Sequence, residues 1–101
     1  MKRAMMEISV VPVGTGSASV SDFVAGVLRI VQDSGLEFRL TPMGTVVQGP
    51  VDQLLRLAEK MHAKPFEMGA PRVVTTIKLD QRADADLSMD GKISSVQEKL
   101  K

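Results

Sequence analysis

Three segments of this 101-residue sequence carry residue types that could do chemistry, and the first contains the only histidine, His62. A histidine that acts as a general base needs a positioned nucleophile, and the sequence has no G-x-S-x-G or similar frame to supply one. The apolar pattern before His62 places it at the end of a helix, where a cationic ring is favourable beside the last carbonyls. We therefore predict a structural or solvent-facing role for this side chain.

The second segment is a loop rich in glycine and hydroxyl groups, Gly14–Ser19, between an expected strand and an expected helix. Backbone N–H groups at such a junction are suited to binding phosphate. The dinucleotide pattern G-x-G-x-x-G is not met because Ser19 stands at its last position, and no G-K-[ST] follows. We predict a glycine-dependent turn with hydroxyl caps, and anion binding is the alternative.

The third segment begins at Asp86 and resembles a calcium-binding loop, with oxygen ligands at its first, third, fifth and ninth positions and Gly91 at the sixth. Its twelfth residue is Gln97, so the bidentate carboxylate of such loops is missing. We predict a helix-capping turn, and a calcium-dependent regulator is the alternative. The charged residues from Asp80 to Asp86 predict a solvated linker rather than a catalytic carboxylate pair.

Composition limits the classes of function further. The 13 basic and 12 acidic side chains leave a net charge of +1, which gives no reason to expect a nucleic acid partner. Cysteine is absent, which excludes disulfides and thiolate chemistry. The apolar run Ile8–Val13 is too short for a signal peptide or a membrane span. We expect one domain over residues 1–101, a cytoplasmic location, no membrane partner, no enzymatic activity, and neither a cofactor nor a metal.

Four strands are expected from short runs in which apolar residues alternate or β-branched residues dominate. They cover residues 6–13, 36–41, 45–48 and 72–80, and the second and third form a hairpin around Pro42-Met43-Gly44. Pro12 has no N–H to give, so we expect pairing to weaken there. The sequence therefore predicts a sheet whose central strands are 6–13 and 45–48.

Three helices are expected from apolar residues that recur at helical spacing. The first has Ser19 as its N-cap, Gly35 just beyond its end, and a stripe formed by Val20, Phe23, Val24, Val27, Leu28 and Val31. The second begins at Gly49-Pro50, has Pro50 as its first helical residue, precedes a loop over 63–71, and buries Val51, Leu54, Leu55, Ala58 and Met61. A C-terminal helix is marked by Met89, Ile93, Val96 and Leu100.

The order β-α-β-β-α-β with a terminal helix predicts an α+β fold of the ferredoxin-like type. Right-handed crossovers place both long helices on one face of an antiparallel sheet and leave the other face open. Such a face is often a site of association or ligand capture. It is expected to carry Glu7, Ser9, Val11, Arg39, Thr41, Val74, Thr76 and Lys78.

Five fragments in the same order make the chain similar to the thiamine-binding protein family, a family of small ferredoxin-like proteins that long had no known function. They are Val11–Thr15, Ser19–Ser21, Pro42–Thr45 followed by Gly49, Arg72–Asp80 with Arg82, and Lys92–Val96. The resemblance extends from Glu7 to Leu100. It implies a homotetramer, a dimer of dimers in which sheets are extended across each dimer and stacked between dimers. It also implies binding of thiamine or its hydroxymethylpyrimidine moiety without turnover.

An aminopyrimidine needs an apolar slot with a few donors and acceptors. From the residues on the open face and on the strand 45–48 we expect Ser9, Thr45, Gln48 and Thr76 to bind the ligand. Where the family usually has Thr-x-x-Glu-Gly, Gln48 replaces the glutamate, which keeps hydrogen bonding and removes a charge. The alternative function is a structural or regulatory assembly module without a small-molecule ligand, in which the open face is only a subunit interface.

Overall fold

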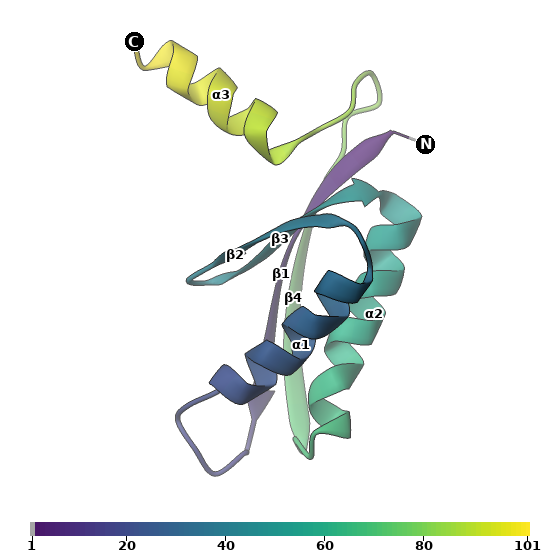
Figure 1. The fold of residues 1–101 in the computed structure, drawn as a ribbon, viewed down its shortest axis with the longest axis vertical. Helices are drawn as coiled ribbons and strands as arrows, with labels where there is room; N and C mark the ends of the chain where they lie inside the picture. Colours follow the sequence, from purple (N-terminus) through teal and green to yellow (C-terminus); the bar gives the residue numbers. More distant parts are fainter. Residues whose placement is uncertain (1) are drawn as a thin grey trace.

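The computed structural model describes residues 2–101, which form one antiparallel sheet and three helices (Figure 1). In chain order the elements are β1 (Arg3–Val13), α1 (Ser21–Asp33), β2 (Glu37–Thr41), β3 (Gly44–Pro50), α2 (Val51–Glu67), β4 (Arg72–Asp80) and α3 (Met89–Lys99). The predicted ferredoxin-like order and the C-terminal helix are confirmed. Among residues 2–101, no helix combines the length and the apolar character needed to cross a membrane.

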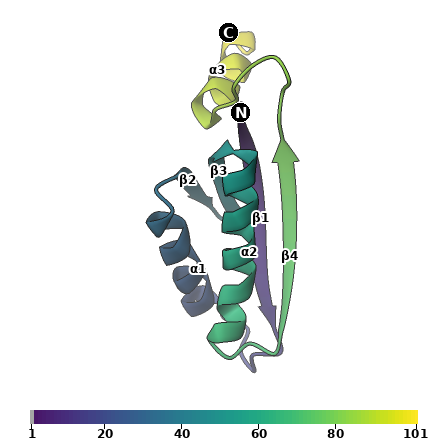
Figure 2. The same cartoon turned by 90° about the vertical axis from the view of Figure 1, so that its right-hand side faces the viewer.

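The strands are ordered β2-β3-β1-β4, and every neighbouring pair is antiparallel. Because side chains alternate along a strand, the register assigns each of them to one face. Ser9 lies opposite Thr76 and Glu7 lies opposite Lys78, with Glu7 Oε1 and Lys78 Nζ 3.6 Å apart. Both long helices cover the other face (Figure 2). The predicted open face is therefore confirmed.

The core lies between the two long helices and the central strands. Its fully buried side chains include Met6 and Ile8 of β1, Val47 of β3, Val31 of α1 and Leu54 of α2. The strand residues alternate by two and the helix residues recur at helical spacing, so each element presents its apolar side to the same space. Burial of these side chains holds the helical layer against one side of the sheet.

Three details of the predicted helices are wrong. Val20, not Ser19, is the N-cap residue of α1, and no side chain caps that end. Pro50 is the N-cap of α2 rather than its first helical residue. Leu55 is 46% exposed and Leu57 is buried in its place, because the buried stripe of α2 continues along positions 54, 57, 58 and 61. Gly35 follows α1 with a φ of +73°, as predicted.

The predicted loop from Ala63 is also wrong, since α2 continues to Glu67 through Pro65. Proline inside a helix removes one backbone hydrogen bond, to the residue four positions earlier. Pro65 is fully buried and lies one helical turn after the buried Met61, so it extends the apolar stripe. Its carbonyl accepts a bond of 2.9 Å from the N–H of Ala70, which ends the helix in an ordered turn.

The neighbouring leucines of α2 test this account of the core. Leu54→Ala leaves a cavity at a site that is fully buried, so we expect it to lower the free energy of unfolding by about 2–5 kcal/mol. Leu55→Ala, at the neighbouring position, is expected to cost below about 1 kcal/mol because that side chain is half exposed. Urea denaturation of both variants measures the difference, and equal losses would contradict the burial assignment.

Candidate functional site

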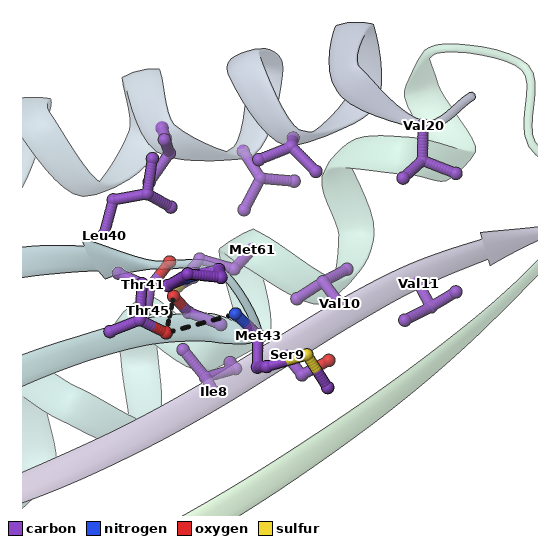
Figure 3. A pocket seen from close by; sticks show the side chains of 15 residues that line it. Ile8, Ser9, Val10, Val11, Val20, Leu40, Thr41, Met43, Thr45 and Met61 are labelled. Carbon is purple, nitrogen blue, oxygen red and sulfur yellow. Dashed lines mark hydrogen bonds between the residues drawn. The ribbon is translucent and has the colours of Figure 1, made fainter.

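A pocket opens where β1 extends beyond the β2–β3 hairpin. Pairing of β1 with β3 ends at Ile8 and Thr45, whereas pairing of β1 with β4 continues to Val13. The second half of β1 therefore has a neighbour on one side only. The space on the other side is closed by α1, one residue of α2 and the hairpin turn (Figure 3). We call it the hairpin pocket, and its lining includes Ile8, Ser9, Val10, Val11, Val20, Val24, Val27, Leu28, Leu40, Thr41, Pro42, Met43, Gly44, Thr45 and Met61.

Thr45 is the buried polar side chain of the hairpin pocket. Its residue is 6% exposed, and it lies opposite Ile8 and Leu40 on the helix-facing side of the sheet. No buried side-chain nitrogen or oxygen among residues 2–101 lacks a hydrogen-bond partner, and beside Thr45 the Thr41 Oγ1 donates to the carbonyl of Gly44 at 2.9 Å. Buried hydroxyl groups usually have a partner. The hydroxyl of a threonine can offer one hydrogen-bond donor and two acceptor lone pairs to a ligand.

The exposed backbone edge of β1 gives the hairpin pocket a second polar feature. A Cβ atom added to Gly44 would lie 2.9 Å from the carbonyl oxygen of Ile8, so that carbonyl faces the hairpin. In an antiparallel strand the N–H and C=O of one residue point to the same side and alternate from residue to residue. Val10, two residues further, therefore points its N–H and C=O into the unpaired space. Pro12 has the same orientation, so its missing N–H leaves no donor unpaired there.

The hairpin pocket is small and uncharged. Its volume is about 290 Å³, at the lower end of the range of roughly 300–1,000 Å³ typical of small-molecule sites. None of its described lining residues is ionisable, and most are valine, leucine, isoleucine or methionine. The pocket therefore suits a flat, neutral ring that can make hydrogen bonds at one edge.

A larger hollow, of about 500 Å³, lies beside the start of α3, but its charges are already paired. Lys92 binds Asp80, and Arg82 binds Asp84 at 2.6 Å. The hydrogen bond from Arg82 holds the pKa of the exposed Asp84 carboxyl below its usual range. This pairing fits the predicted solvated linker, and we do not assign a site there.

The four residues expected to bind a ligand do not meet at one place. Ser9 of β1 and Thr76 of β4 are neighbours on the open face. Gln48 of β3 is on the same face, but it lies opposite Met5, four residues before Ser9 along β1. Thr45 faces the helices instead, because it alternates with the open-face residues of β3. Of the four, Ser9 and Thr45 line the hairpin pocket.

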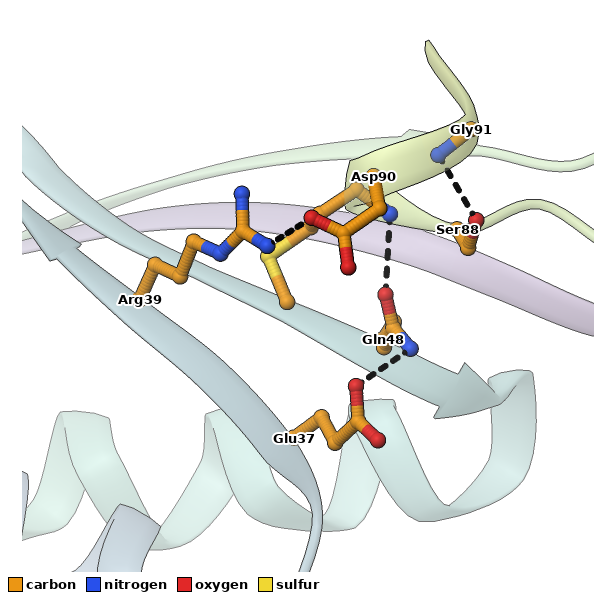
Figure 4. A network of polar contacts seen from close by, with 7 residues as sticks. Glu37, Arg39, Gln48, Ser88, Asp90 and Gly91 are labelled. Carbon is orange, nitrogen blue, oxygen red and sulfur yellow. Dashed lines mark hydrogen bonds and ion pairs between the residues drawn. The ribbon is translucent and has the colours of Figure 1, made fainter. Parts of the chain in front are cut away.

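Gln48 holds the C-terminal segment against the sheet (Figure 4). Its side chain is 7% exposed, its Nε2 donates to Glu37 Oε2 at 2.9 Å, and its Oε1 accepts from the N–H of Met89 at 2.9 Å. Both ends of the amide are therefore used within the chain. Next to it, Arg39 of β2 binds Asp90 of α3. These contacts fix the start of α3 over one end of the open face.

The remaining candidate residues have structural partners. His62 lies within α2 rather than at its end, because the helix continues to Glu67. Its Nδ1 is 2.6 Å from Thr75 Oγ1, and its ring packs edge-on against Phe66. Ser88 caps α3 by accepting from the N–H of Gly91 at 3.0 Å, which confirms the predicted capping turn. Within residues 2–101 no group of three or more metal-ligating side chains is found.

The sequence analysis did not identify several residues that line the hairpin pocket, although two features of the sequence indicate them. The apolar stripe on the sheet-facing side of α1 begins with two valines, Val20 at the N-cap and Val24 in the helix. Their short side chains leave space between the helix and the sheet. Pro12 in a long strand indicates an edge without a partner. Both signals become meaningful only when β1 is known to be longer than the hairpin beside it.

Comparisons with known proteins agree with this architecture. A family model described as "Thiamine-binding protein" matches residues 6–97. The UPF0045 protein YqgV of Bacillus subtilis is 34% identical over 101 residues, covering 96% of this chain and 97% of that protein. The crystal structure of protein MJ1052 of Methanocaldococcus jannaschii is 30% identical and superimposes with a TM-score of 0.89, covering 97% and 99% of the two chains.

A second similar structure is a putative thiamine biosynthesis/salvage protein of Thermotoga maritima. It has a TM-score of 0.79 and covers 93% of this chain and 98% of its own. At 19% sequence identity this likeness concerns the fold alone.

The position of Gln48 generates a test of how α3 is attached. Gln48→Met removes the acceptor of the Met89 N–H, so we expect hydrogen exchange at that amide to become about 5–30-fold faster, as for a loss of about 1–2 kcal/mol. Glu37→Gln leaves the Gln48 oxygen that accepts from Met89 and keeps an acceptor for Gln48 Nε2, so it is expected to leave this exchange rate nearly unchanged. Amide exchange measured by NMR or mass spectrometry compares them. Equal rates in both variants would show that Gln48 does not hold α3.

Proposed function

Because the chain belongs to the thiamine-binding protein family, we propose that it binds the aminopyrimidine part of thiamine in the hairpin pocket. The ligand is thiamine itself or its hydroxymethylpyrimidine moiety. The observation that carries this proposal is that Thr45, a largely buried polar residue, lines an apolar space large enough for one ring.

The chemistry of an aminopyrimidine edge matches the polar groups of the hairpin pocket. The ring offers a nitrogen acceptor next to an amino donor, and the N–H and C=O of Val10 supply a donor and an acceptor in the same direction. Thr45 is placed to bind a further polar atom of the ring. Ile8, Val24 and Met61 cover the faces of the ring with apolar surface.

Charge favours the pyrimidine over the thiazolium ring as the part that is buried. A thiazolium is a cation, and burial of a cation is costly without a negative partner. The described lining of the hairpin pocket has none. We therefore propose that the pyrimidine enters the pocket and that the thiazolium of thiamine remains in water.

The same arrangement supports binding without turnover. A general acid or base needs an ionisable group within reach of the substrate, and the described lining consists of apolar side chains and the hydroxyls of Ser9, Thr41 and Thr45. We further propose a homotetramer in which sheets join edge to edge and pairs meet through their open faces. The cytoplasmic location stays a prediction from the sequence.

Two threonines provide a matched test of the binding site. Thr45→Val removes the buried hydroxyl at nearly constant volume, and we expect affinity for hydroxymethylpyrimidine and thiamine to fall about two- to tenfold, as for the loss of about 0.5–1.5 kcal/mol. Thr76→Val, on the open face, is expected to leave both affinities unchanged. Isothermal titration calorimetry of the wild type and both variants gives the comparison. Thermal melting shows whether either variant changes stability.

Opposite effects of the two substitutions would move the site to the open face. If neither ligand gives heat or a melting shift with the wild type, the binding function is rejected and the chain is an assembly module without a small-molecule ligand. Thermal melting of Thr45→Val without ligand separates any loss of stability from a loss of affinity. A weaker ligand affinity therefore reports on the ligand contact.

A further inference from the structure

The turn of the β2–β3 hairpin carries Met43, a large apolar side chain that is 87% exposed. No other large apolar side chain among residues 2–101 is as exposed. Apolar surface is unfavourable in water, so this side chain gains free energy when something covers it. Figure 3 shows Met43 where the turn borders the hairpin pocket, whose lining includes it. A molecule bound in that pocket would therefore supply the contact that Met43 lacks.

The backbone of this turn is fixed beside β1. The ring of Pro42 restricts its backbone φ. The N–H of Met43 donates to Thr41 Oγ1 at 3.3 Å, and Thr41 Oγ1 donates to the carbonyl of Gly44 at 2.9 Å. A Cβ atom added to Gly44 would lie 2.9 Å from the carbonyl oxygen of Ile8, so the turn lies directly against β1. The backbone of Met43 is thus held at the rim of the pocket, while its side chain has three rotatable bonds with which to adapt.

Other parts of the pocket lining cannot move over a ligand as easily. Ile8, Val27 and Met61 are buried members of the core, and their movement would disturb its packing. Met43 has no such packing to lose. Small-molecule sites usually bury about 70–90% of the surface of a drug-sized ligand. A ring held against the unpaired half of β1 therefore needs a cover on its outer side.

We propose that Met43 folds over the outer face of the bound pyrimidine and contacts the ring through its thioether. This inference rests on the proposed binding of an aminopyrimidine in the hairpin pocket. A thioether sulfur makes favourable contacts with an aromatic ring at about 5 Å, and the unbranched methionine chain fits irregular gaps. Met43 therefore determines specificity, because a saturated ring of the same size would not make the contact between sulfur and the aromatic ring.

Substitutions at two exposed positions test this contact. Met43→Ala is expected to weaken binding of thiamine and of hydroxymethylpyrimidine about three- to tenfold, because both ligands carry the ring that Met43 covers. Met43→Leu keeps an apolar cover, so we expect a smaller loss. Leu100→Ala is the matched control and is expected to bind as the wild type does, since Leu100 is 79% exposed and does not line the hairpin pocket. Isothermal titration calorimetry compares the affinities, and thermal melting without ligand checks that each variant is folded.

Nuclear magnetic resonance of the methionine methyl groups reports on the contact in the wild type itself. A methyl group over the face of an aromatic ring has its signal shifted upfield by the ring current. The three phenylalanines all lie within the described residues, and none of them lines the hairpin pocket. We expect the Met43 methyl signal, assigned by its loss in Met43→Leu, to move upfield when hydroxymethylpyrimidine is added. The signal of Met68, which is outside the hairpin pocket, is expected to stay in place.

The outcomes separate this inference from the proposed function. If the wild type gives neither heat nor a melting shift with either ligand, both are overturned. If the wild type binds but its Met43 methyl signal does not move, or Met43→Ala binds as tightly as the wild type, the role of Met43 alone is overturned. An equal loss of affinity in Met43→Ala and Leu100→Ala also overturns that role, because the effect would then not be specific to the pocket.

Discussion

The difference in length between β1 and the β2–β3 hairpin is the constraint on which the candidate site depends. β1 has 11 residues and pairs with β4 along its second half, but the hairpin turns back at Pro42–Gly44. A sheet strand with one missing neighbour exposes backbone donors and acceptors, which water or a ligand must satisfy. Here α1 covers that gap from one side, so the exposed edge lies at the bottom of an apolar pocket instead of on an open surface. The same hairpin turn also brings Thr45 next to Ile8.

Most of the fold could be predicted from the sequence because its signals are local. Strand 72–80, the glycine after α1 and the open-face residues follow from alternation and turn chemistry. The errors occur where tertiary packing outweighs a local preference. Pro65 is tolerated in α2 because its ring is buried along the stripe of Met61, and Leu55 is exposed because the sheet contacts a different side of the helix.

The site was less predictable because it depends on which strand ends first. The sequence indicated Thr45 and Ser9 as polar residues near the sheet centre, but the face of Thr45 follows from its register with Ile8 and Leu40. Gln48 was expected at a ligand, and the structure places it between Glu37 and the N–H of Met89. That partnership joins residues 41 positions apart in sequence, and no periodic pattern reveals it.

Pro12 has a consequence for how the exposed edge of β1 is protected. An unpaired strand edge attracts extended segments of other chains, and a proline on such an edge removes one of the donors that an added strand would use. Pro12 is two residues beyond Val10 on the same side of β1, so the edge can complete one pair of bonds with a small molecule but not a continuous ladder with a polypeptide. Pro12 thereby disfavours the addition of a further strand, and with it aggregation, along the part of β1 that has no β3 partner.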